Sequence, residues 1–111
     1  MSFSSSQIPF APLGGTATVV ANVAAPVGVQ VPVTSPEYQA GQYRIVNAST
    51  NTVFLGYGST AAAAQTAAAS AATSIPLLAG AVEIIRFGNA TYFSATAAGA
   101  SNVYITPGQG L

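Results

Sequence analysis

The sequence predicts an all-β domain: an antiparallel β-sandwich or jelly roll of about eight short strands, preceded by an extended N-terminal arm. Two observations lead to this fold class. Apolar and polar residues alternate over short runs, which is the period of a strand with one buried face. Glycine, proline or small polar residues separate these runs, as expected for turns. An up-and-down barrel is the alternative architecture.

The chain divides into an arm at residues 1–15 and one domain at residues 16–111. Serines near the start of the arm favour solvation, its two prolines block a helix, and a Gly–Gly pair forms a hinge. A disordered terminus is the alternative, but two phenylalanines favour an arm that lies on a neighbouring subunit. The candidate partner-binding residues are Phe3, Ile8, Phe10 and Leu13.

The strand signals run from residue 16 almost to the end of the chain. The cleanest alternation is Val27–Val33, in which Pro32 predicts an edge strand because proline cannot donate to a ladder. Gln42–Ala48 and Thr52–Tyr57 are predicted to pair as a hairpin across the three polar residues between them. The remaining predicted strands are Thr16–Val23, Ser74–Leu78, Ala81–Phe87, Thr91–Ala95 and Asn102–Thr106.

Residues 59–73 form an alanine-rich segment between two predicted strands. Alanine has the highest helix propensity, and Ser59 or Thr60 is a candidate N-cap. The segment nevertheless lacks an amphipathic stripe of large side chains, and isolated helices this short are marginal in water. We expect a loop, with room for a turn or two of helix, that packs closely against a neighbour. A plain surface loop is the alternative.

The composition excludes most catalytic and ligand-binding chemistry. The chain contains no Lys, Asp, His, Cys or Trp, and those residue types supply most general acids and bases, nucleophiles and metal ligands. We therefore expect no enzymatic activity, no metal, no cofactor and no small-molecule substrate. Two arginines cannot neutralise a phosphate backbone, which argues against a nucleic-acid partner. No apolar run of about 20 residues predicts a membrane span, and the N-terminus lacks the features of a signal peptide.

One motif resembles a cofactor site. Residues 56–61, Gly-Tyr-Gly-Ser-Thr-Ala, match the G-x-G-x-x-G/A pattern of dinucleotide-binding turns. The chain has no alternation of strands and helices, and no acidic residue lies about 20 positions further on. We interpret the motif as a turn at the end of a strand.

The four charged residues are candidates for structural ion pairs. Glu83 and Arg86 point to opposite faces of one extended strand, so a pair between them is not expected. Arg44 and Arg86 are instead expected to meet Glu37 or Glu83 across strands, or a charge on a partner subunit. Such a pair would favour register and specificity more than stability.

So few charges indicate a subunit of a larger assembly. An ordinary soluble domain is about a quarter charged, whereas 4% of this chain is charged and its net charge is zero. Charge near zero removes the repulsion that keeps free monomers apart. A chain whose surface is covered by neighbours does not need that repulsion.

Residues 42–111 contain four short sequence segments, called phrases below, that carry a family resemblance. The phrases are Arg44-Ile45-Val46-Asn47, Val53-Phe54-Leu55-Gly56-Tyr57-Gly58, Ile75-Pro76-Leu77-Leu78-Ala79-Gly80-Ala81-Val82-Glu83 and Val103-Tyr104-Ile105-Thr106-Pro107-Gly108. In these phrases the chain resembles small virion proteins of tailed bacteriophages, encoded among the head genes and often assigned to capsid decoration. No catalytic residues come with this resemblance.

The resemblance implies a decoration or cement protein on the outside of the capsid. Such a protein binds the assembled shell rather than dispersed subunits, and so stabilises the shell by mass action. The implied partners are the major capsid protein and copies of this chain, as a homodimer or homotrimer. The implied location is the capsid surface of the virion, after synthesis in the host cytoplasm, with which the absence of cysteine is consistent.

Three other functions compete with capsid decoration. The chain is alternatively another virion component, such as a tail, fibre or head–tail joining protein, or a self-assembling fibre or surface-layer subunit. A different class is a carbohydrate- or host-surface-binding module whose tyrosines stack on sugars, although core or interface packing explains the same residues. The tyrosines concerned are Tyr38, Tyr57, Tyr92 and Tyr104.

Overall fold

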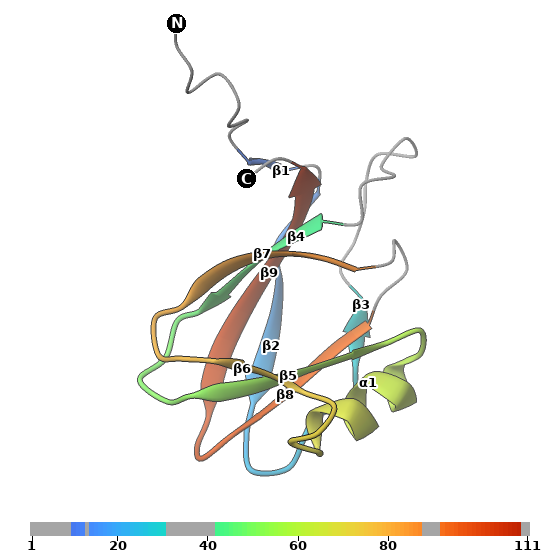
Figure 1. Cartoon of the computed structure of the whole chain (residues 1–111), viewed down its shortest axis with the longest axis vertical. Coiled ribbons are helices and arrows are strands. Elements are labelled where there is room, and N and C mark those ends of the chain that lie inside the picture. Colours follow the sequence, from blue (N-terminus) through green and yellow to red (C-terminus); the bar gives the residue numbers. More distant parts are fainter. Residues whose placement is uncertain (1–9, 13, 31–41, 88–91, 110–111) are drawn as a thin grey trace, which may run out of the picture.

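The computed structural model describes residues 10–12, 14–30, 42–87 and 92–109 (Figure 1). These residues form two antiparallel sheets and one short helix, which confirms the all-β prediction. The elements are β1 (Ala11–Pro12), β2 (Ala17–Ala21), β3 (Val29–Gln30), β4 (Gln42–Asn47), β5 (Val53–Gly58), α1 (Ala61–Ala68), β6 (Ile75–Leu77), β7 (Val82–Arg86), β8 (Tyr92–Ala97) and β9 (Ser101–Gln109).

Strands that follow one another along the chain mostly lie in different sheets. Sheet A has the order β1-β9-β4-β7, and β2 pairs with β9 alongside β1. Sheet B has the order β3-β8-β5-β6. From β2 onward, only β5 and β6 are both consecutive and paired. The position of β3 at the edge of sheet B confirms the edge-strand prediction, although Pro32 itself lies outside the described residues.

The predicted hairpin between β4 and β5 is wrong. The strand β4 pairs with β7 and β9, whereas β5 pairs with β6 and β8, so the polar connection crosses from one sheet to the other. The buried side-chain amide of Asn47 fastens this crossover by donating to the carbonyl oxygens of Asn51 (2.8 Å), Leu77 (3.0 Å) and Leu78 (3.1 Å). A polar loop suits a crossover as well as a hairpin, so the local pattern did not distinguish them.

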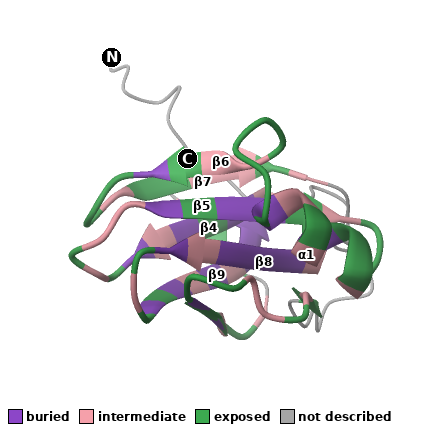
Figure 2. Cartoon of the chain, turned by 90° about the horizontal axis from the view of Figure 1, so that it is seen from below, coloured by how far each residue is buried: buried purple, intermediate pink, exposed green. Residues whose placement is uncertain are grey.

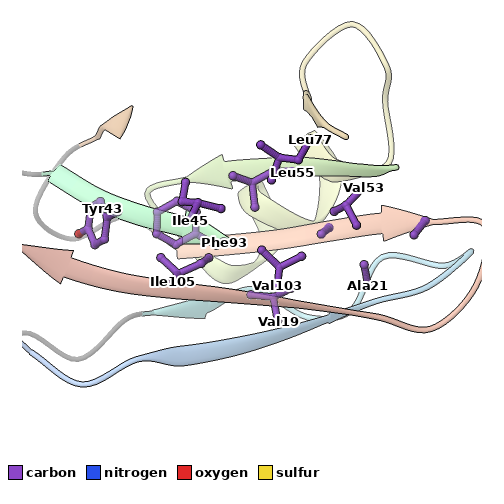
Figure 3. Close-up of a cluster of buried hydrophobic side chains, with 12 residues drawn as sticks. Val19, Ala21, Tyr43, Ile45, Val53, Leu55, Leu77, Phe93, Val103 and Ile105 are labelled. Carbon is purple, nitrogen blue, oxygen red and sulfur yellow. The ribbon is translucent and has the colours of Figure 1, made fainter. Parts of the chain in front are cut away.

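The hydrophobic core lies between the two sheets (Figure 3). Side chains from β2, β4 and β9 of sheet A meet side chains from β5, β6 and β8 of sheet B. At one end the core is aromatic: the Phe93 ring packs edge-on against Tyr43 at 5.2 Å and Phe87 at 5.1 Å between ring centroids. The buried core residues are Val19, Ala21, Tyr43, Ile45, Val53, Leu55, Leu77, Phe93, Ala95, Ala97, Val103 and Ile105.

The alanine-rich segment contains more order than a plain loop. Helix α1 is eight residues long, which is about two turns, and the Oγ1 of Thr60 caps it by accepting from the Ala63 backbone N–H at 3.1 Å. The helix packs closely, as expected, but on the outer side of this chain's own sheet B. In Figure 2 the strands under α1 are mostly buried and the outer side of the helix is exposed. Contact between that exposed side and another molecule stays a prediction.

The glycines of the G-x-G motif explain how the helix approaches so closely. A Cβ atom on Gly56 would lie 2.6 Å from the Ala64 carbonyl oxygen and closer still to the backbone of Ala68. A Cβ on Gly58 would lie 2.8 Å from the Ala63 Cβ. The motif does mark the end of a strand, since β5 ends at Gly58 and the chain bends before α1 begins at Ala61. Its glycines have a second role that the prediction missed: they let the strand lie close to the helix.

Candidate interaction surface

The outer faces of the two sheets differ in their side chains and in what covers them. On sheet B, α1 covers glycines of β5 and small side chains of β8. On sheet A, α1 makes no such cover, and the outward side chains are larger. We call this second surface the open face; its residues in β2, β4, β7 and β9 are Thr18, Val20, Gln42, Arg44, Val46, Val82, Ile84, Arg86, Asn102, Tyr104 and Thr106.

A row of apolar side chains crosses the open face; we call Tyr104, Val46, Val82 and Ile84 the apolar row. The register places Val46 between Tyr104 on β9 and Val82 on β7. Ile84 stands next to Val82 on the same face of β7, and Val82 is 50% exposed. Valine and isoleucine in this position are unusual for the solvated face of an antiparallel sheet, which is normally polar. The row has the composition of an interface centre.

Both arginines of the chain lie on the open face, beside this apolar row. Arg44 stands between Thr106 and Ile84, and Arg86 lies opposite Gln42. Glu83 pairs with Ile45, so its side chain belongs to the opposite face of β7. Among the described residues the open face therefore carries two positive charges and no carboxylate. The predicted counter-charge from Glu37 lies outside the described residues, and the ion-pair predictions stay predictions.

A hollow of about 510 Å³ opens at one end of the open face. Arg44, Thr16 and Thr106 supply its polar wall, and Phe10 with the Gly14–Gly15 backbone supplies much of the rest. The two threonine Oγ1 atoms are hydrogen-bonded to each other at 2.6 Å. We call this hollow the Arg44 recess. It forms where β1 and β2, separated by the two glycines, follow one another along the edge of β9.

The pairing of β1 with β9 shows where part of the predicted arm lies. Strand β1 pairs with the end of β9, and the half-buried Phe10 ring packs against Gly108, where a Cβ atom would collide with it. Of the four candidate anchors, Phe10 alone falls within the described residues, and it contacts its own chain. Phe3, Ile8 and Leu13 lie outside them. Binding of a partner by this set stays a prediction.

The candidate sugar-stacking tyrosines do not gather at one place. Tyr57 is 44% exposed, but its ring packs 4.8 Å from the Phe87 ring at the aromatic end of the core. A hollow of about 490 Å³ lies beside Tyr57 and includes Ser74, whose buried Oγ has no hydrogen-bond partner. Tyr104 lies half-buried on the open face, and Tyr38 lies outside the described residues.

Sequence reasoning missed the open face. The partner contacts were expected in the arm and the alanine-rich segment, and Arg44, Arg86 and Tyr104 were named without being grouped on one face. The available signal was in β7, Val-Glu-Ile-Ile-Arg, where the charged Glu83 shares a phase with Ile85 and the apolar Val82 and Ile84 share the other. If Glu83 and Ile85 lie on the core-facing side of β7, then Val82 and Ile84 lie on its outward side. The outward side of the strand is then apolar as well.

Within the described part of the chain, no three His, Cys, Asp or Glu residues gather to hold a metal ion. The helix found there is too short to cross a bilayer. The chain matches no protein-family model, no curated protein and no solved structure. A function for the chain therefore has to be argued from the chemistry of its surfaces.

Proposed function

We propose that this chain is a non-enzymatic structural protein of a bacteriophage virion, which binds the outside of the capsid and bridges neighbouring capsid subunits. The observation that carries the proposal is the open face. It combines an apolar row with two arginines on a chain that has only two other charged side chains, Glu37 and Glu83. Tyrosine and arginine around an apolar centre are typical of protein interfaces. The resemblance of residues 42–111 to capsid decoration proteins supplies the identity of the partner.

We further propose that the domain is a jelly-roll sandwich with an N-terminal arm. The strand orders support this, because β2-β9-β4-β7 and β3-β8-β5-β6 are the orders that eight strands adopt when two Greek keys are wound together. Jelly rolls are frequent in viral capsid proteins. The arm, with Phe3, Ile8 and Leu13, would add a second contact to the one made by the open face.

Binding to purified shells that lack this protein tests the proposal. The double variant Val82→Thr/Ile84→Thr keeps both positions β-branched, although threonine is smaller than isoleucine, and makes the apolar row polar. We expect its affinity for shells to fall about tenfold or more, because burying the two hydroxyls loses most of the hydrophobic contribution of these side chains.

The matched control is Val23→Thr/Val27→Thr. These valines are more exposed, at 74% and 66%, but lie in the segment between β2 and β3 rather than on the open face. We expect the control to bind shells like the wild type. Equal losses in both double variants, or in neither, would contradict docking through the open face.

Two rival functions have separate tests. A tail, fibre or head–tail joining role predicts a few to dozens of copies per particle, whereas decoration predicts hundreds, so the stoichiometry in the native particle distinguishes them. A carbohydrate-binding role is favoured only by the hollow beside Tyr57, with its exposed ring and unpartnered Ser74 Oγ. Binding of the wild type to a glycan array, lost in Tyr57→Ala, would support that role.

A further inference from the structure

The Arg44 recess is rich in hydrogen-bond donors, and no carboxylate is among the described residues that line it. A guanidinium group carries five N–H donors and no acceptor. Thr16 and Thr106 have two hydroxyl hydrogens between them, and their mutual bond uses one, so the second is available to another acceptor. No described carboxylate lies on this face, since Glu83 belongs to the other side of β7. This arrangement suits an anion.

If a partner docks on the open face, Arg44 in the recess needs an anion as its counter-charge. Arg44 is exposed in the free chain, next to Ile84 and the apolar row. A partner that covers the row also removes water from the guanidinium. An arginine buried without a counter-charge is strongly unfavourable, whereas a carboxylate held by two parallel N–H bonds offsets that cost.

A second copy that meets the first open face to open face does not supply a carboxylate among the described residues. If two open faces met around a two-fold axis, each would bring Arg44 and Arg86 and no described carboxylate. Like charges brought together across an interface oppose association. Face-to-face pairing of two copies is therefore unfavourable, and a different protein whose surface is acidic at this point fits the recess better.

We propose that the Arg44 recess receives the carboxylate of an aspartate or glutamate side chain on the capsid shell, and that this contact sets the orientation in which the chain docks. The inference rests on the proposed function and adds a chemical requirement to it. Planar two-point contact fixes direction as well as position, which an apolar row alone does not.

The first test measures shell binding by Arg44→Gln, with Arg86→Gln as the matched control. Both variants remove one positive charge from the open face, but Arg86 does not line the recess. We expect Arg44→Gln to lower the affinity at least about tenfold and Arg86→Gln to lower it by less than about threefold. Arg44→Lys should recover little of the loss, because an ammonium group cannot make the two-point contact. Equal effects of the two Gln variants would overturn the proposal.

The variant Glu37→Gln tests whether the counter-charge comes from the chain itself. Wild-type shell affinity in Glu37→Gln supports a carboxylate from the shell. A loss as large as that of Arg44→Gln would overturn the proposal, because Glu37 would then be the partner of Arg44.

The second test uses sodium acetate and the full chain without shells. In NMR spectra, acetate should shift the Nε–H signal of Arg44 in a saturable way and that of Arg86 much less, with sodium chloride at equal ionic strength as the control. Equal or absent shifts would overturn the recess as an anion site. If the wild type does not bind shells at all, the proposed function fails and the acetate result decides the recess alone. If Arg44→Gln binds shells like the wild type, the recess fails and the proposed function stands.

Discussion

The outer faces of sheet B and sheet A differ in the size of their side chains and in whether α1 covers them. Beneath α1, sheet B presents glycine, serine and threonine, which the chain covers with its own helix, whereas Phe54 on the same face stays 38% exposed. Sheet A presents valine, isoleucine, tyrosine and arginine, and α1 does not cover them. Small residues thus mark the surface that is filled from within. Large ones mark the surface that we propose another protein fills.

The largest expected effect comes from adding one atom under the helix. In Gly56→Ala the new Cβ would collide with the backbone of Ala64 and Ala68, which cannot move aside as a side chain could. We expect a loss of about 3 kcal/mol in the free energy of unfolding, the upper range for overpacked sites. Urea denaturation followed by circular dichroism measures it.

Gly99→Ala is the control for this substitution. Its added Cβ would have only the Asn51 Nδ2 nearby, at 3.8 Å, which is ordinary contact. Its stability should equal or slightly exceed that of the wild type, because alanine loses less backbone entropy on folding. Similar losses in both variants would show that the helix does not depend on a glycine surface.

A smaller effect is expected where a side chain of sheet B fastens the end of α1. The Thr96 hydroxyl donates to the Ala68 carbonyl oxygen at 3.0 Å. Thr96→Val keeps the shape of the side chain but removes this donor, so we expect a loss of about 1 kcal/mol. Thr18→Val, on the open face, should change the free energy of unfolding by less than about 0.5 kcal/mol. A larger loss in Thr18→Val than in Thr96→Val would reverse the comparison.

The smallest effect on stability should come from the open face itself. Val82→Thr/Ile84→Thr removes apolar surface that is already partly in water, so the free energy of unfolding should change by less than about 1 kcal/mol. The same variant is expected to lose shell binding. Loss of binding without loss of stability separates a docking surface from a core. If this variant unfolds as readily as Gly56→Ala, the open face is structural.

Much of the strand content was predictable because alternation is local. The runs at residues 16–23, 42–48, 81–87 and 102–106 all contain strands, with shifts of a few residues at their ends. The assignment of strands to sheets was not predictable in the same way. Asn47 is polar and ends a strand, but its three carbonyl partners come from the loop before β5, the last residue of β6 and the residue after it, and no local pattern reveals them.

The candidate site was harder to predict than the fold. The identity of the outward face of β7 depends on its pairing with β4, which places Glu83 opposite the buried Ile45 and Val82 opposite Val46. From the sequence, the charged residue would be expected to face solvent on the polar side. A charge on the core-facing phase of an edge strand also discourages unwanted strand pairing, a benefit that appears only once β7 is known to lie at an edge.

The placement of β9 has a consequence for how this protein is made. This strand comes last among the described elements, yet it lies inside sheet A, between β2 and β4. While the ribosome is still translating residues 101–109, β2 lacks its partner in sheet A and β4 has only β7 beside it, so the sheet cannot close. Folding therefore waits for synthesis to reach the final strand, and it then joins segments far apart in sequence, a slow class of transition. Until that moment the nascent chain exposes valine-rich segments with few charges to keep them apart, which makes chaperone protection during translation valuable.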